Sequence, residues 1–281
     1  MRGLRATTNT KKAVIYSVCT FLAILSIFPF WIMIMNATRS TYEIQQNSIA
    51  LLPSKYFFNN LDILLGKSFN PAVGFMNSML ISSGATLCAV YFSSLTAYAL
   101  VAYNWRLRGP FFTFILAVLM IPTQVSGIGF YQFMYRIGWT NNLWPLILPA
   151  IATPTMVFFM RQYLIASLSL EIVDSARIDG SGEFNTFNRI ILPIMKPAMA
   201  TQAIFTFVFN WNRLFEPLIL LTDNDKYTMP IMVSLLRGDI YKTEYGSVYL
   251  GLTLTVLPLF IVYFLLSKYI IAGVALGALK E

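Results

Sequence analysis

Residues 171–180 read Glu-Ile-Val-Asp-Ser-Ala-Arg-Ile-Asp-Gly, and residues 190–193 read Ile-Ile-Leu-Pro. This polar and charged stretch falls within residues 164–197, between long apolar runs of the chain. Charged side chains are costly in the hydrocarbon of a bilayer and are rare there. We therefore expect residues 164–197 to lie at the water-facing surface of a membrane.

The composition is that of an integral membrane protein. Of the 281 residues, 57% are hydrophobic and only 11% are charged, whereas ordinary soluble domains carry about 25% charged residues. The net charge of +8 therefore indicates membrane topology rather than a nucleic-acid partner. The chain has no histidine, the commonest general base and metal ligand near neutral pH. We expect no catalytic residues and no metal site.

Six apolar stretches are long enough to cross about 30 Å of hydrocarbon as helices. The fourth contains several prolines and should be kinked. The first follows basic residues, as in a signal peptide, but its apolar run is too long for one and no cleavage site follows, so we expect it to be retained. The sequence predicts an all-α integral membrane fold, one domain over residues 1–281, with spans at about 13–35, 75–101, 111–130, 143–163, 198–221 and 248–271.

The basic residues predict the orientation. Lys and Arg near the ends of spans favour the cytoplasmic side. If the N-terminus is cytoplasmic, most of the 20 basic residues fall in cytoplasmic segments. Both termini and residues 164–197, between spans four and five, are then expected in the cytoplasm.

Residues 164–197 also carry signals of local structure. Ser169 and Glu171 favour the start of a helix, Gly180 and Gly182 can end it, and a second short segment should begin at about Glu183. This pattern predicts a helix, a turn and a helix along the membrane surface. A solvated connector is the alternative, but most connectors are about four to six residues long, so a docking surface is favoured.

The spacing of this stretch resembles the permease subunits of bacterial ATP-binding-cassette importers. Their cytoplasmic loop reads E-A-A, three residues, G, nine residues, I, one residue, L-P. The matching positions here are Asp174-Ser175-Ala176, Gly180, Ile190 and Leu192-Pro193. Asp174 and Ser175 depart from the letters but keep the charge and the small size. Further stretches are similar to the carbohydrate-uptake branch, close to the smaller permease of maltose-type systems: residues 142–149, 161–162, 176–180, 211–212 and 273–280.

The resemblance implies that this loop couples the spans to a separate ATPase dimer. Its residues here would be Glu171, Asp174, Ser175, Ala176, Arg177, Asp179, Gly180, Ile190, Leu192 and Pro193. It also implies a second homologous permease, an extracytoplasmic solute-binding protein, a sugar substrate and the inner membrane of a bacterium, and that the C-terminal tail touches the ATPases. ATP and Mg would be bound by the ATPase subunits. The nearest phosphate-loop lookalike in this chain, residues 61–68, lacks the first glycine of that motif, so we expect no cofactor on this chain.

The fifth predicted span contains a polar cluster: Asn210, Trp211, Asn212, Arg213, Phe215 and Glu216. An Arg at membrane depth costs about 2.5–3.5 kcal/mol, so it should face the bundle interior or a wet cavity. Arg213 and Glu216, three residues apart, could form an ion pair with a structural role. Alternatively the cluster lines a translocation path, with Trp211 or Phe215 stacking on a sugar ring. An unpaired Arg213 would favour an acidic sugar such as a uronate, because a guanidinium can grip a carboxylate with two hydrogen bonds.

The sequence therefore predicts the permease subunit of a binding-protein-dependent importer for oligosaccharides or related sugars. One alternative is the same importer carrying acidic oligosaccharides. An ion-coupled secondary transporter would need intramembrane carboxylates, of which Glu216 is the evident one. An integral membrane enzyme would need a catalytic cluster that the sequence does not offer, and a non-catalytic scaffold would not need the loop spacing.

Overall fold

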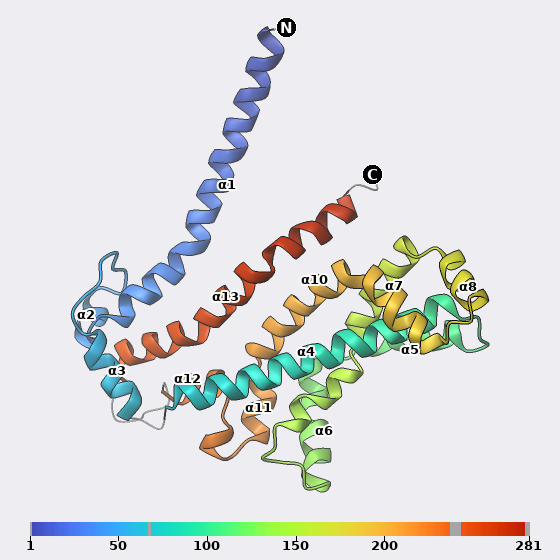
Figure 1. Ribbon diagram of the computed structural model, residues 1–281. Helices are drawn as coiled ribbons and strands as arrows, with labels where there is room; N and C mark the ends of the chain where they lie inside the picture. Colours follow the sequence, from blue (N-terminus) through green and yellow to red (C-terminus); the bar gives the residue numbers. More distant parts are fainter. Residues whose placement is uncertain (1, 67–68, 237–242, 279–281) are drawn as a thin grey trace. The chain divides into compact units, whose positions relative to one another are not determined.

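The computed structural model describes residues 2–66, 69–236 and 243–278 (Figure 1). These residues form helices joined by turns and loops, with no strand among them. The first six residues of the phosphate-loop lookalike belong to α3 (Phe57–Gly66). Its last two residues, 67 and 68, and the end of the C-terminal tail, including Lys280, lie outside the described residues.

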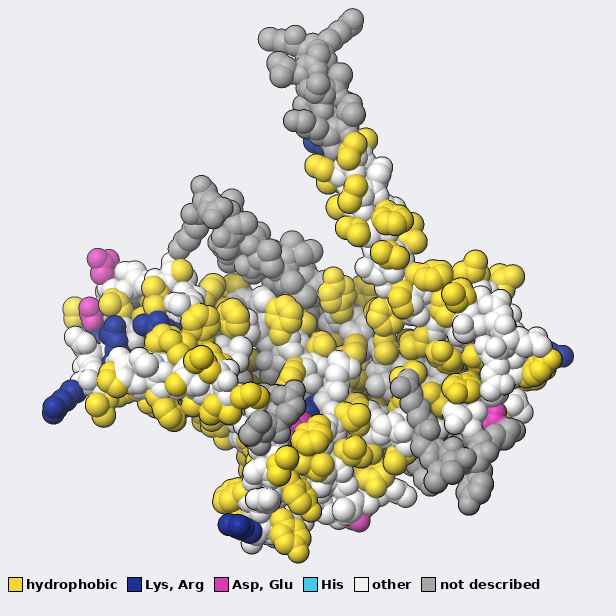
Figure 2. Space-filling model, turned by 180° about the vertical axis from the view of Figure 1, so that it is seen from behind, with side chains coloured by type: hydrophobic (Ala, Val, Ile, Leu, Met, Phe, Trp, Pro, Cys, Tyr) yellow, Lys and Arg dark blue, Asp and Glu magenta, His cyan; other side chains and the backbone are white. Residues whose placement is uncertain are grey.

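Five helical stretches in the described part of the chain are long and apolar enough to cross a membrane, where the sequence predicted six spans. They are Lys12–Ala37, Pro71–Ala102, Trp144–Ser167, Glu183–Trp211 and Tyr245–Phe264. Many large apolar side chains on these helices are exposed, and Figure 2 shows hydrophobic side chains over much of one face, with few charged ones among them. Such a surface suits lipid or partner helices rather than water.

The predicted third span is not one helix. The chain forms α5 (Arg108–Leu119) and α6 (Thr123–Arg136), separated by residues 120–122. Pro122 has no backbone N–H, and its ring disfavours a helical conformation of Ile121. The 12 residues of α5 reach about 18 Å, short of the roughly 30 Å of a bilayer core. The prediction of a continuous span over 111–130 is wrong.

The predicted fourth span begins irregularly. Two 3₁₀ turns, η1 (Trp144–Leu146) and η2 (Leu148–Ile151), precede α7 (Pro154–Ser167). Each of these three elements has a proline in its first two positions, where the missing N–H costs no internal hydrogen bond. Each proline therefore begins a new helical element, so the predicted span is interrupted and not only kinked. At its other end, α7 extends to Ser167, beyond the predicted end at 163.

The predicted fifth span also has different limits. Its helix begins at α9 (Glu183–Thr186), continues through the π-helical turn η3 (Phe187–Ile191) and becomes α10 (Leu192–Trp211). Three residues then interrupt it before α11 (Phe215–Leu220). The prediction of a single helix over 198–221 is therefore wrong at both ends. The helix begins well before residue 198, with Pro193 in the first turn of α10, and it stops at the polar residues after Trp211.

The chain divides into two compact units, and the first combines residues 1–69 with 233–256. It contains α1 (Arg2–Ala37), α2 (Thr41–Gln46), α3, part of α12 (Met229–Leu236) and the start of α13 (Tyr245–Ala278). Buried Asn60 joins these segments, because its Nδ2 donates to the carbonyls of Ala37 and Arg39, 2.9 Å away in each case, and its own carbonyl accepts from the Ser247 hydroxyl.

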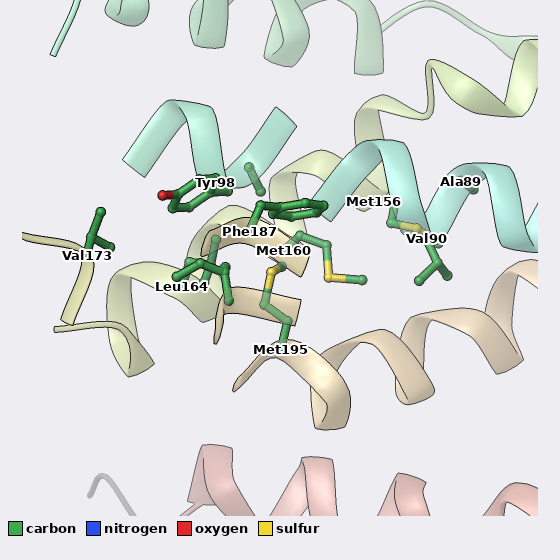
Figure 3. Packing of buried hydrophobic residues seen from close by; sticks show 11 residues of the cluster. Ala89, Val90, Tyr98, Met156, Met160, Leu164, Val173, Phe187 and Met195 are labelled. Atoms are coloured by element: carbon green, nitrogen blue, oxygen red, sulfur yellow. The ribbon is translucent and has the colours of Figure 1, made fainter. Parts of the chain in front are cut away.

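The second unit, residues 70–232 with 257–281, contains the segments with candidate sites. Its central helix, α4 (Pro71–Ala102), packs against α7 and α10. Figure 3 shows the shared core, where the rings of Tyr98 and Phe187 stack with centroids 5.8 Å apart. Buried Ala89 and Ala97 on α4 leave room for close helix packing. Parts of residues 164–197 and of α10 therefore pack on the same core.

Candidate functional site

The predicted docking helix corresponds to α8 (Leu170–Ile178), which has two different faces. Val173 and Ala176 are only 1% and 6% exposed, and Val173 belongs to the core shared by α4, α7 and α10. Glu171, Asp174 and Ser175 are exposed. Ala176, the third residue of the matching motif, packs inward. The inner face therefore anchors α8. The exposed side chains of the helix include the polar Glu171, Asp174 and Ser175 and the apolar Leu170, Ile172 and Ile178.

The turn after α8 has the hydrogen bonds of a Schellman motif. The N–H of Gly180 donates to the Arg177 carbonyl, 3.0 Å away, and the N–H of Ser181 donates to the Ala176 carbonyl, 2.9 Å away. Gly180 has φ of +76°, a conformation that residues with a Cβ adopt at a cost. A Cβ there would meet no other atom within 4 Å. Glycine is thus required by backbone conformation, not by lack of space.

The second half of the motif is anchored inside the protein. Ile190 and Leu192 are partly buried against the same core as Val173, at the junction of η3 and α10. Pro193 is exposed in the first turn of α10. In this chain the apolar residues of the motif therefore fix the direction in which α10 leaves the loop.

A polar network beneath α8 centres on Glu183. Its Oε1 accepts a hydrogen bond from Nε of Arg177, 2.8 Å away, and its Oε2 accepts from the hydroxyls of Tyr98 and Tyr103. Arg177 also pairs with Asp174 at 3.2 Å. The sequence predicted Glu183 only as the start of a helix and did not single out the tyrosines. No local spacing relates positions 98, 103 and 183, so the fold alone brings them together.

The electrostatics of this network hold its groups in fixed protonation states. Burial, followed by the hydrogen bond to Glu183, raises the pKa of Tyr103, so its hydroxyl stays a donor. The hydrogen bond to Glu183 raises the pKa of Arg177, whose guanidinium lies 5.4 Å from the centre of the Tyr103 ring, a cation–π distance. Both shifts favour the protonated forms of Tyr103 and Arg177, which are the forms that donate to Glu183.

A cavity of about 490 Å³ lies between α10 and the proline-rich segment before α7. Of the predicted path residues, Asn210, Arg213 and Glu216 line it. Nε of Arg213 lies 3.0 Å from Oε2 of Glu216, and the two side chains are 23% and 16% exposed. The ion pair considered from the sequence is therefore formed, in the wall of a cavity.

Residues 89–275 match the family model of the binding-protein-dependent transport system inner membrane component. The chain belongs to this family. The permease is similar to the arabinooligosaccharides transport system permease protein AraQ of Halalkalibacterium halodurans, with 34% identity over 92% of this chain and 93% of that protein. It is also similar to the lactose transport system permease protein LacG of Rhizobium radiobacter, with 33% identity over 94% of this chain and 95% of that protein.

A solved structure shares the fold of the permease. It is that of a bacterial ABC transporter involved in the import of the acidic polysaccharide alginate, with a TM-score of 0.78, 20% identity and coverage of 93% of this chain and 96% of that one. The family identifies the permease as an inner membrane component of a binding-protein-dependent transport system, and the relatives are themselves transport permease subunits.

The other predicted path residues of the permease do not line the cavity. Trp211 is 1% exposed, stacks on Phe207 with centroids 5.7 Å apart and meets the edge of Phe75. Its ring is enclosed, so the structure does not offer it to a sugar. Asn212 is exposed and donates to the Val208 carbonyl, and Phe215 is exposed outside the cavity lining.

Sequence reasoning missed Gln202 and Thr206, which line the cavity together with Asn210. The three residues are four positions apart on α10, so they share one helix face. This spacing was a usable signal. It was overlooked because Gln202 and Thr206 are uncharged and lie in a run of apolar residues.

Proposed function

We propose that the permease is one of two membrane subunits of an ATP-driven importer of neutral oligosaccharides, and that α8 is its docking helix for a separate ATPase dimer. The observation that supports the proposal is that one face of α8 is buried and the other is exposed. Its apolar face is fixed to the core of the second unit, while Glu171, Asp174 and Ser175 remain exposed. When a partner displaces a short helix that is anchored in this way, the helices packed against it are displaced as well.

The proposed partners follow from this role. A second homologous permease completes the membrane part, the ATPase dimer binds ATP and Mg, and an extracytoplasmic binding protein delivers the sugar. Residues 164–197 and both termini then face the cytoplasm, which agrees with the distribution of Lys and Arg.

The cavity next to α10 supports a neutral substrate. Arg213 is paired with Glu216, so a substrate carboxylate would have to displace a carboxylate already in place, at the cost of leaving Glu216 unpaired. Gln202, Thr206 and Asn210 offer donors and acceptors suited to hydroxyl groups. The names of AraQ and LacG, which refer to arabinooligosaccharides and lactose, support the same substrate class.

Purification of the permease from its native membrane in mild detergent, with mass spectrometry of the co-purifying chains, tests the assembly. We expect a second permease, an ATPase and a binding protein. ATP hydrolysis by the complex in nanodiscs is then measured with the binding protein and either neutral or uronate oligosaccharides. Stimulation by neutral sugars supports the proposal, and stimulation by uronates alone contradicts the substrate assignment. Recovery of the permease without an ATPase contradicts the importer.

A further inference from the structure

Glu183 joins its own helix to two other segments, the end of α4 and the docking helix α8. Tyr98 lies near the end of α4, Tyr103 directly follows that helix, and Arg177 lies on α8. All three donate hydrogen bonds to the Glu183 carboxylate, which is at the start of the helix that continues into α10. One side chain therefore ties the docking helix to the ends of the two main helices of the core.

The two carboxylate oxygens serve different neighbours. Oε1 accepts a hydrogen bond from the guanidinium of Arg177, and Oε2 accepts one from each of the two tyrosine hydroxyls. Charge-assisted hydrogen bonds of this kind are about twice as strong as neutral ones. Removal of the carboxylate would leave three donors without their common acceptor. The contacts that remain between α8 and the core would be the buried side chains of Val173 and Ala176 and the cation–π contact of Arg177 with the Tyr103 ring.

The helix that starts at Glu183 leads to the cavity. It passes through η3 and α10 to the face formed by Gln202, Thr206 and Asn210. One turn after Glu183, Phe187 stacks on Tyr98, and the Tyr91 hydroxyl on α4 donates to Oδ1 of Asn188, 3.2 Å away. These contacts also join α4 to this helix. Apolar contacts can slide past one another, whereas a bridged carboxylate has a defined geometry.

We propose that Glu183 is a positioning residue that makes α8 move together with the cytoplasmic ends of α4 and α10. The inference rests on the proposed function, in which an ATPase displaces α8. Without Glu183, α8 keeps its outer surface and still docks, but its displacement is no longer transmitted to the helix that lines the cavity. ATP hydrolysis then loses its response to the sugar-loaded binding protein.

The test uses the complete importer in nanodiscs, with the binding protein either empty or loaded. The measured quantity is the ratio of ATP hydrolysis in these two conditions, at equal amounts of co-purified ATPase. Glu183→Ala is expected to lower the ratio about tenfold, in the usual range of coupling between sites. Glu183→Gln keeps one acceptor oxygen and should lower it less. The matched control is Asn185→Ala, because Asn185 is exposed on the same short helix and its amide hydrogen-bonds to Ser181 within the loop.

An unchanged ratio in Glu183→Ala, with the ATPase still bound, overturns the inference. If this variant loses its ATPase, the double variant Tyr98→Phe, Tyr103→Phe takes its place, because it removes two donors and leaves the surface of α8 intact. A normal ratio there also overturns the inference. Failure of the proposed function gives a different result, since in that case wild-type permease brings no ATPase with it.

Discussion

Nε of Arg213 lies 3.0 Å from Oε2 of Glu216 in the wall of the cavity beside α10. The pair offsets the charge of an arginine that would otherwise cost about 2.5–3.5 kcal/mol at membrane depth. The same two side chains line one cavity with Gln202, Thr206 and Asn210. The pair can therefore have a structural role and a transport role at once, and substitutions can separate them.

Arg213→Ala should lower the thermal stability of the complex, because Glu216 is left in a mostly buried position without its cation. The double variant Arg213→Gln, Glu216→Gln should restore stability, since it replaces both charges. Uptake should remain impaired in both. Melting of the purified complex and sugar uptake into proteoliposomes measure the two effects. Full recovery of uptake in the double variant would show that the pair is structural only.

Thr206→Val should weaken sugar uptake without affecting assembly. It removes a hydroxyl from the cavity wall, and the loss of one hydrogen bond of about 1 kcal/mol raises the KM roughly fivefold. Thr201→Val on the same helix is the matched control, because its hydroxyl donates to the Pro197 carbonyl and is not among the cavity residues. Equal effects of the two substitutions on KM would argue against a sugar-binding role of this cavity.

Gly180→Pro should abolish the response of ATP hydrolysis to the loaded binding protein while leaving the permease inserted. Proline cannot adopt the φ of +76°, and it removes the N–H that bonds to the Arg177 carbonyl. Gly180→Ala is a milder substitution for comparison. It costs about 1–2 kcal/mol of backbone strain, and its Cβ would clash with no other atom. Retained stimulation in Gly180→Pro would contradict the coupling role of this turn.

Gly246→Ala should destabilise the first unit. A Cβ at this position would lie 2.3 Å from the Arg39 carbonyl oxygen and 2.5 Å from the Asn60 amide, so backbone must shift, and overpacking of this kind costs about 1–3 kcal/mol or more. Gly66→Ala, in the same unit, is the comparison because a Cβ there meets nothing within 4 Å. Protease resistance of the two variants in detergent measures the difference, and equal resistance would refute the steric argument.

The helix, turn and helix over residues 169–186 could be predicted because capping residues and glycines act on the backbone close to their own positions. A helix start near Ser169, a glycine at 180 and a second start at Glu183 agree with α8, the turn and α9. The breaks in the spans were missed because hydropathy averages over a single proline such as Pro122. The orientation of Trp211 was missed for another reason: Phe75 and Phe207 enclose its ring, and no pattern around residue 211 indicates a partner on α4.

Photo-crosslinking from position 175 tests the central claim most directly. Ser175 is exposed on the outer face of α8, and a photoreactive amino acid there can report what docks on it in the native membrane. The comparison is the same amino acid at exposed Tyr42 on α2, in the segment between the first two predicted spans, which is expected on the opposite side of the membrane. We predict that position 175 crosslinks to an ATPase subunit and position 42 does not. A complex that contains the ATPase but yields no such crosslink from position 175 would contradict the account.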